Sequence, residues 1–259
     1  MQQPNDALFA LLLATAAGMA TMVGAVIIFF VKGKSEKLLA SSLGFSGGMM
    51  IAVSLIELFP SAQEAFAQSM STLNGTLLSV AWLIGGVLIA RLLDSLVPHD
   101  QPKSSAGTRQ HKDLLRVGMV SAMAILLHNF PEGIATFMAA YTDPTLGITL
   151  AIAISMHNIP EGISVALPIY YATNSKRRAL FYTFISGIAE PIGALLAWLV
   201  LAPYITASMM GALFAMVAGI MLYIAFEELL PSSRQYGHDR LALWSLFAGV
   251  CVMPISMAI

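Results

Sequence analysis

Two copies of one short motif carry the residues that are best suited to chemistry. HNFPEG begins at His128 and HNIPEG begins at His157, and the eleven-residue segments around them share eight identities. In a helix, the His and the Glu of each copy lie on one face, about 40° apart, with the Asn on the other side of the Glu. Together the copies supply imidazole, carboxamide and carboxylate groups from His128, Asn129, Glu132, His157, Asn158 and Glu161.

This set of side chains favours a divalent metal cation. Nitrogen and oxygen ligands without thiolate suit borderline ions such as zinc, iron(II), cobalt and manganese better than copper(I). Because each glutamate lies between a histidine and an asparagine, the geometry predicts two adjacent metal sites that share the glutamates. Cys251 is the single cysteine, which excludes an intrachain disulfide and a metal cage built from cysteines.

Other acidic residues lie in apolar segments. Glu190 in SGIAEP is predicted to be a further ligand, with a protonated glutamate hydrogen-bonded inside the bundle as the alternative. Glu57 and Glu228 each stand three residues before a proline, where they either line an entrance or exit for the cation or snorkel to the interface. Glu227 faces away from Glu228. No Lys or Arg lies deep in these segments, so we expect a bound cation to compensate the carboxylates.

The elements that must position these residues are membrane helices. Of the 259 residues, 58% are hydrophobic and 10% are charged, whereas soluble domains carry about 25% charged residues. This composition nearly excludes a soluble globular enzyme and predicts a polytopic protein of the lipid bilayer. The formal net charge of -1 gives no reason to expect a nucleic-acid partner.

Apolar stretches of about 20 residues, the length that crosses a bilayer, recur along the whole chain. We expect an all-α fold in which eight transmembrane helices form one domain over residues 1–259. The expected spans are 7–31, 38–59, 76–93, 114–140, 146–170, 179–201, 205–230 and 241–258.

The basic residues predict the orientation of these spans. All 13 follow or flank the odd-to-even connections: Lys32, Lys34, Lys37, Arg91, Lys103, Arg109, Lys112, Arg116, Lys176, Arg177, Arg178, Arg234 and Arg240. The positive-inside rule therefore places these connections in the cytoplasm and both termini outside, as in a bacterial inner membrane protein. The polar stretch at about 95–113 is the longest such loop. Its His99 and His111 could capture metal, although two histidines so far apart in a loop are more often solvated.

Internal repeats indicate how the spans are arranged. The two motif copies lie on consecutive spans and therefore run in opposite directions through the membrane. A second match, six identities in fifteen, relates residues 48–62 to residues 219–233 and so pairs the second span with the seventh. These matches predict a 3+2+3 inverted repeat with the motif helices at its centre, an arrangement typical of transporters.

Each motif also contains a proline, Pro131 or Pro160, which cannot donate to the carbonyl four residues earlier. We expect each motif helix to be broken one residue before its histidine. Broken helices at mid-membrane commonly expose polar backbone to a transported ion. In the alternative, the prolines only kink packed helices, and Gly133 and Gly162 only allow the helices to approach closely.

The motifs HNFPEG, HNIPEG and SGIAEP resemble those of the ZIP (Zrt/Irt-like) family of divalent metal transporters, and the resemblance covers the full chain. It implies a homodimeric helical bundle that moves metal toward the cytoplasm by alternating access. The implied cargo is Zn2+ and Fe2+, with Mn2+, Co2+ and Cd2+ as further ions, and no catalytic cofactor is implied. The resemblance implies one metal site of His128, Glu132, His157 and Glu161, and a second of Asn129, Glu132, Asn158, Glu161 and Glu190.

Three functions are compatible with these residues. A metal importer would run on the ion gradient without ATP, because the GKS at 33–35 lacks the earlier glycine of a Walker A loop. An intramembrane serine protease would use Ser46 in GFSG with His128 or His157 as base, but it would not explain the paired Asn and Glu residues. A membrane di-metal oxidase would pair Glu-x-x-His motifs, whereas here the order is His-x-x-x-Glu.

Overall fold

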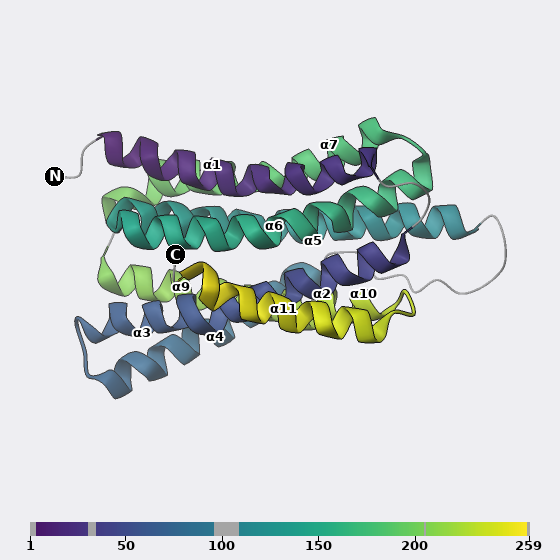
Figure 1. The fold of residues 1–259 in the computed structure, drawn as a ribbon. Coiled ribbons are helices and arrows are strands. Elements are labelled where there is room, and N and C mark those ends of the chain that lie inside the picture. The colour runs from purple at the N-terminus through teal and green to yellow at the C-terminus, as the bar shows by residue number, and fades with distance from the viewer. Residues whose placement is uncertain (1–3, 31–34, 96–108, 205, 258–259) are drawn as a thin grey trace.

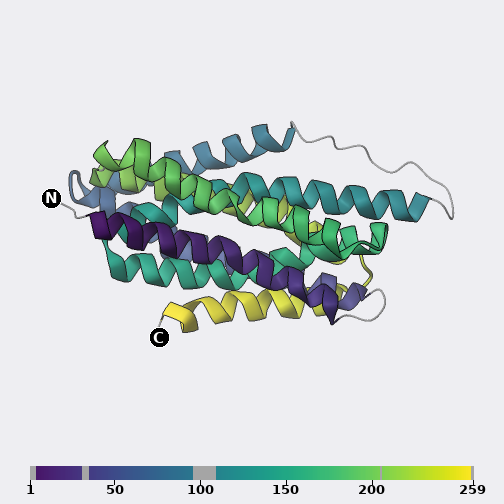
Figure 2. The ribbon, with the colours of Figure 1, turned by 90° about the horizontal axis from the view of Figure 1, so that it is seen from above.

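The computed structural model describes residues 4–30, 35–95, 109–204 and 206–257. The described residues form helices and short connections, with no strand among them, which confirms the all-α fold class. The helices run side by side along one common direction (Figure 1). The first helix begins and the last helix ends at the same end of this bundle, on the left in Figures 1 and 2.

Within the described residues, eight helical runs overlap the eight predicted apolar spans. Three of them contain a short π-helical segment directly after an α-helix. The runs are α1 (Pro4–Val26) with a 3-10 turn (Ile27–Phe29); α2 (Glu36–Ala52), a π segment (Val53–Leu58) and α3 (Phe59–Ala67); α4 (Thr72–Ser95); α5 (Arg109–Thr142); α6 (Pro144–Thr173); α7 (Lys176–Gly187), α8 (Ala189–Leu196), a π segment (Ala197–Leu201) and a 3-10 turn (Ala202–Tyr204); α9 (Ala207–Ile224), a π segment (Ala225–Leu229) and α10 (Leu230–Arg234); and α11 (Asp239–Met257).

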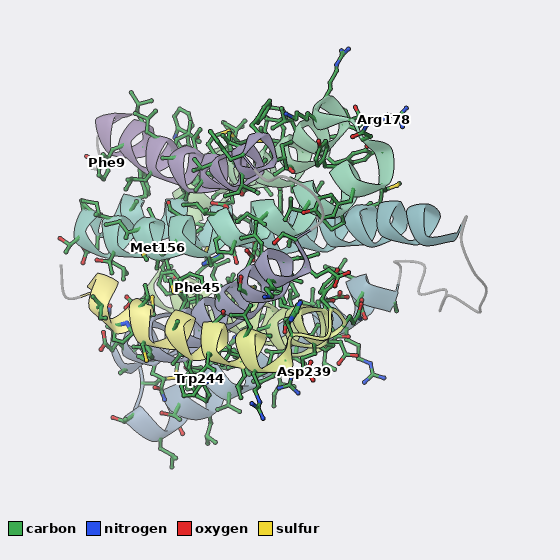
Figure 3. All side chains as sticks on the ribbon, turned by 45° about the vertical axis from the view of Figure 1, so that its right-hand side comes forward. Phe9, Phe45, Met156, Arg178, Asp239 and Trp244 are labelled. Atoms are coloured by element: carbon green, nitrogen blue, oxygen red, sulfur yellow. The ribbon has the colours of Figure 1, made fainter. Side chains whose placement is uncertain are left out.

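Six runs within the described residues are long and apolar enough to cross a membrane: Asp6–Phe29, Glu36–Ala67, Thr72–Ser95, Pro144–Thr173, Lys176–Tyr204 and Ala207–Arg234. α5 and α11 are further long helices of 34 and 19 residues. Large apolar side chains cover the outside of the bundle, as Trp244 on α11 and Phe9 on α1 illustrate (Figure 3). A bilayer solvates such a surface, whereas water would not.

The helices form two groups. α1, α5, α6, α7 and α8 pack on one another and are called the motif bundle, because both motif copies lie in it. α2, α3, α4, α9, α10 and α11 form the flanking bundle, which occupies the lower half of Figure 1. α2 packs against α6, and α9 against α5, where the two bundles meet. In Figure 3, Met156 of α6 and Phe45 of α2 lie on the two sides of this junction.

Polar side chains define where the helices begin. The Asp143 carboxylate accepts hydrogen bonds from the backbone N–H groups of Thr145 and Leu146 at the start of α6. The hydroxyls of Ser35, Ser175 and Thr206 do the same at the starts of α2, α7 and α9. Each cap satisfies a backbone donor that has no partner within its own helix.

Glycines let helices of the motif bundle approach so closely that a side chain would not fit. A Cβ on Gly162 of α6 would lie 1.9 Å from the Thr21 carbonyl oxygen of α1, and one on Gly133 of α5 would lie 2.0 Å from the Glu190 carbonyl oxygen of α8. The reciprocal contacts are made by Gly24 and Gly193. The structure therefore confirms the close-packing role of both motif glycines.

The flanking bundle contains the same kind of contact. Glycines of α2 and α11 face carbonyls of each other's helix, and so do glycines of α4 and α9. The pairs are Gly48 with Leu246, Gly249 with Phe45, Gly219 with Leu83, and Gly86 with Met216. The helix pairs α2·α11 and α4·α9 are thus joined by matching contacts.

The prediction that the motif prolines break their helices was wrong. Pro131 lies inside the continuous α5, and Pro160 and Pro168 lie inside the continuous α6. A missing N–H removes a single intrahelical hydrogen bond, and tight packing on both sides holds the rest of the helix. The interruption occurs instead in the next run, at Ile188 between α7 and α8, directly before the Glu190-Pro191 pair.

Prolines also accompany the three π-helical segments. Each segment ends two residues before a proline, namely Pro60, Pro203 or Pro231. Widening the turn relieves the clash between a proline ring and the preceding carbonyl. Glu57 and Glu228 both lie in such segments, which gives the second and seventh spans the same local irregularity at matched positions of their repeat.

The predicted loop at about 95–113 lies largely outside the described residues, and with it His99. α5 begins at Arg109, so its helix extends beyond the predicted start of the fourth span at residue 114. His111 belongs to α5, but its side chain lies outside the described part of the structure. Metal capture by these histidines stays a prediction.

Candidate metal-binding site

The two motif copies meet where α5 and α6 pack together in the middle of the motif bundle. His157 Nε2 of α6 lies 3.3 Å from Glu132 Oε2 of α5, and both side chains are fully buried. Two ligands of one tetrahedral zinc ion, each about 2.0–2.2 Å from the metal, are separated by about 3.3 Å. The spacing of these two atoms fits a direct hydrogen bond between them and also fits two ligands of one metal ion.

The other ring nitrogen of His157 holds the imidazole in place. Nδ1 lies 3.2 Å from the Ala153 carbonyl oxygen, one turn earlier on α6. A ring N–H that donates to a carbonyl fixes the orientation of a ligating histidine and raises its basicity. This contact leaves Nε2 directed at Glu132.

The two asparagines present their oxygens to the site. Asn129 donates from Nδ2 to the Ser186 carbonyl at 3.2 Å, and Asn158 donates from Nδ2 to the Ala17 carbonyl at 2.9 Å. Both side chains are fully buried, and neither Oδ1 has a donor among the described residues. Each carboxamide thus uses its nitrogen to hold a neighbouring helix and leaves its oxygen available to a cation.

Glu190 completes the group from α8, directly after the interruption at Ile188. Asn158 Nδ2, which also donates to Ala17, donates a hydrogen bond to Glu190 Oε1. Glu190 Oε2 has no donor among the described residues. The side chain is fully buried, and Glu132 and Glu161 are close enough for the charges of the three carboxylates to interact. Three carboxylates in one buried place repel each other unless protons or cations intervene.

Unsatisfied oxygens mark this place among the described residues. Six buried side-chain atoms lack a hydrogen-bond partner, and all are oxygens of the motif bundle: Thr21 Oγ1, Asn129 Oδ1, Glu132 Oε1, Thr136 Oγ1, Asn158 Oδ1 and Glu190 Oε2. Buried acceptors are normally satisfied, so such a cluster requires an explanation. Buried water or a cation can satisfy such acceptors, and a cation can be shared by several of them.

No three His, Cys, Asp or Glu side chains of the described residues converge as a ready metal cage. The predicted site also includes asparagine oxygens, which are outside that set of ligand types, and it stays a prediction. His128 lies on α5, but its side chain is not described, so its predicted pairing with Glu132 stays a prediction.

Ser46 is a neighbour of the site that sequence reasoning interpreted differently. Its hydroxyl donates to Glu161 Oε1 at 3.1 Å, reaching from α2 of the flanking bundle into the motif bundle. A serine protease would need the Ser46 hydroxyl to be hydrogen-bonded to a histidine, but here the acceptor is the Glu161 carboxylate. The small residues of GFSG were the only signal in the sequence, and they do not reveal this long-range contact.

Glu57 lines a cavity at the end of the bundle away from the described basic residues. The cavity has a volume of about 660 Å³, and its polar lining includes Glu57, Glu64 and Asp143. Thr142 of α5 also lines it, ten residues beyond Glu132, or about 15 Å along the helix. Glu228 does not line this cavity, so its predicted place on the path stays a prediction.

Comparison with known proteins decides the family. The family model described as ZIP zinc transporter matches residues 98–257. Zinc transporter ZupT of Streptococcus mutans is 43% identical over 253 residues, 96% of either chain. The proteins of the same name from Lysinibacillus sphaericus and Nitratidesulfovibrio vulgaris are 45% and 44% identical, over 94% and 99% of either chain. The chain belongs to the ZIP zinc transporter family.

Membership in the ZIP family confirms the resemblance of the motifs and identifies a multi-pass membrane protein that transports a divalent metal ion. ZIP proteins are transporters rather than enzymes. The protease and oxidase alternatives are therefore wrong. The metal is therefore cargo rather than a resident cofactor.

Proposed function

We propose that this protein imports zinc into the cytoplasm through the site between α5, α6 and α8. The observation that carries the proposal is the cluster of buried oxygens without donors around Glu132, Asn158 and Glu190. The relatives named zinc transporter support zinc as cargo. The nitrogen and oxygen ligands also suit Fe2+, Mn2+, Co2+ and Cd2+, which we propose as further cargo.

Two adjacent metal positions share the glutamates. The first uses His128, Glu132, His157 and Glu161, and the second uses Asn129, Glu132, Asn158, Glu161 and Glu190. The two oxygens of Glu132 support this division, because Oε2 faces His157 and Oε1 is left for a second ion. A carboxylate that bridges two cations needs both of its oxygens directed in this way.

The helices are proposed to form eight spans in a 3+2+3 inverted repeat. Eight contacts between a glycine and a backbone carbonyl support this arrangement. They form four pairs, and the two contacts of each pair lie at equivalent positions of the two repeats. Gly48 faces Leu246 as Gly219 faces Leu83, and Gly249 faces Phe45 as Gly86 faces Met216. Gly162 faces Thr21 as Gly133 faces Glu190, and Gly24 faces Ile159 as Gly193 faces Phe130.

The basic residues give the proposed orientation. The start of α7, the end of α10 and the start of α11 lie at the right end of Figure 1, and they carry Lys176, Arg177, Arg178, Arg234 and Arg240. Arg178 projects from that end in Figure 3. This end faces the cytoplasm of a bacterial cell under the positive-inside rule, and both termini face outward. The acidic cavity at Glu57 is then the outer entrance, where negative charge attracts divalent cations.

Transport would follow from movement of one helix group against the other. Ser46 and Glu161 bridge the motif and flanking bundles, so this contact must change when the bundles shift. The driving force is the ion gradient and the membrane potential, without ATP or a catalytic cofactor. We further propose a homodimer, which the mass of the purified protein in detergent, measured by light scattering, would test.

Zinc flux into proteoliposomes tests the proposed function. Purified protein should carry Zn2+ inward, and Glu132→Gln should abolish the flux because it removes the shared charge. Tyr223→Phe is the control, since Tyr223 donates to Asp94 in the flanking bundle, away from the site. Competition by other metals and an imposed or collapsed pH gradient would report selectivity and proton coupling. Equal flux by Glu132→Gln and wild type would overturn the proposed site.

A further inference from the structure

One buried hydroxyl beside the site comes from α1, which sequence reasoning did not connect to metal binding. Thr21 is fully buried, and its Oγ1 has no hydrogen-bond partner among the described residues. A buried hydroxyl without a partner lowers stability, so native structures rarely retain one without a reason.

The hydroxyl of Thr21 differs from those of comparable residues in the bundle. Ser54, Ser155 and Thr183 each donate to the carbonyl four residues earlier, at 2.7–2.9 Å. This bond to the preceding turn is the usual way for a helical Ser or Thr to satisfy its hydroxyl. Thr21 does not use it, although Ala17 lies at the required position.

The neighbours of Thr21 are the segments that carry metal ligands. A Cβ on Gly187 of α7 would lie 3.5 Å from Thr21 Oγ1, and Gly187 stands three residues before Glu190. A Cβ on Gly162, the residue after Glu161, would meet the Thr21 carbonyl oxygen. One turn earlier on α1, the Ala17 carbonyl accepts from Asn158. Thr21 therefore stands between α6 and α7, against the segments that carry Glu161 and Glu190.

Thr21 also occupies the position on α1 that corresponds to Glu190 on α8. Gly162 faces the Thr21 carbonyl as Gly133 faces the Glu190 carbonyl, and a Cβ on Gly18 would lie 2.9 Å from Glu190 Cβ as one on Gly187 would lie 3.3 Å from Thr21 Cβ. At the place where one repeat presents a carboxylate, the other presents a hydroxyl. Both side chains have an oxygen without a donor.

We propose that Thr21 Oγ1 is a further oxygen ligand of the transported cation, held either directly or through one water that the cation retains. The inference rests on the proposed function and adds a ligand from α1 to it. A neutral oxygen can enter a site that already holds three carboxylates without adding charge. Neutral oxygen ligands favour Mn2+ over the softer ions, so Thr21 should affect selectivity as well as affinity.

The isosteric variant Thr21→Val separates a ligand from a structural residue. It removes the hydroxyl and preserves the shape of the side chain. We expect the Kd for Zn2+, measured by titration calorimetry on purified protein, to rise about tenfold, and that for Mn2+ to rise more. The Tm of the metal-free protein should stay unchanged or rise, because the variant removes an unsatisfied polar group. Thr21→Ser should restore zinc binding.

Thr183→Val is the matched control. This threonine is equally buried, but its hydroxyl already donates to Ala179, so the variant should lower Tm slightly and leave the Kd unchanged. A lower Tm with unchanged zinc binding for Thr21→Val would overturn the inference.

Glu132→Gln in the same assay separates this inference from the proposed function. If Glu132→Gln loses zinc and Thr21→Val binds like wild type, the ligand role of Thr21 is wrong and the proposed site stands. If neither variant changes the Kd, both are wrong.

Discussion

The two motif copies on α5 and α6 have nearly the same sequence but different surroundings. Their glycines meet equivalent backbone carbonyls, and their asparagines each donate to a carbonyl of a neighbouring helix. Glu161 accepts from Ser46 of the flanking bundle, and among the described residues Glu132 has no such contact to that bundle. Glu132 faces His157, whereas the side chain of His128, the equivalent histidine, is not described. Asn158 also binds Glu190, and no such contact is seen for Asn129 among the described residues. The copies share their backbone packing, and the polar contacts of their described side chains differ.

The largest expected effect tests the shared packing. Gly162→Ala and Gly133→Ala should both prevent folding, because the added Cβ would lie about 2 Å from a backbone carbonyl that cannot move away. The yield of monodisperse protein after purification measures this. Gly85→Ala is the control, since nothing lies within 4 Å of that position, and it should fold like wild type. Normal folding of only one of the two motif variants would show that the packing is not shared.

The second prediction concerns the glutamates. Glu132→Gln and Glu161→Gln should each lower zinc flux by at least about 100-fold. Substitution of residues that only support a metal ligand already lowers metal affinity or activity about 10–100-fold. The two losses should be similar, since each carboxylate is proposed to serve both metal positions. A large loss for one variant with normal flux for the other would mean that a single metal position suffices.

The asparagines should respond unequally. Asn158→Ala removes a contact to Ala17 and a contact to Glu190, whereas Asn129→Ala removes a contact to Ser186 alone. We expect about a tenfold loss of zinc affinity for Asn158→Ala and a smaller loss for Asn129→Ala, because hydrogen bonds to a charged group are the stronger ones. Titration calorimetry measures the difference. A larger loss of zinc affinity for Asn129→Ala than for Asn158→Ala would contradict the importance of the hydrogen bond between Asn158 and Glu190.

Ser46→Ala should produce the smallest effect and the one most specific to α6. Loss of its hydrogen bond to Glu161 should raise the KM for zinc by about threefold to tenfold, with little change in folding. Ser46→Thr should retain most of the uptake. Ser54→Ala on the same run is the control, because the Ser54 hydroxyl donates to its own helix at Met50. If Ser46→Ala and Ser54→Ala changed the KM for zinc equally, the hydrogen bond from Ser46 would not distinguish Glu161 from Glu132.

Much of this molecule could be predicted from its sequence because the signals are local. A run of about 20 apolar residues specifies a membrane helix without reference to the rest of the chain. The spacing of His, Asn and Glu specifies which side chains share a helical face, and the buried contact between His157 and Glu132 agrees with it. Duplication of the motif supplied the second half of the site.

The unpredicted features depend on contacts between distant segments. Ser46 meets Glu161 across 115 residues, and Asn158 meets Ala17 across 141 residues. The continuity of α5 and α6 through Pro131 and Pro160 has the same origin, because packing around a proline decides whether its helix breaks. No local pattern reports the surroundings of a residue.

The orientation of the two asparagines has a consequence for the electrostatic balance of the site. Glu132, Glu161 and Glu190 contribute three negative charges when ionised, so one divalent cation leaves the site negative and two leave it positive. Deamidation of Asn158 to aspartate would shift this balance by one unit. It would also replace a donor with an acceptor opposite the Ala17 carbonyl, so the two would repel each other. Loss of a single amide nitrogen would thus change the preferred number of bound ions and remove one of the polar contacts that join α1 to α6.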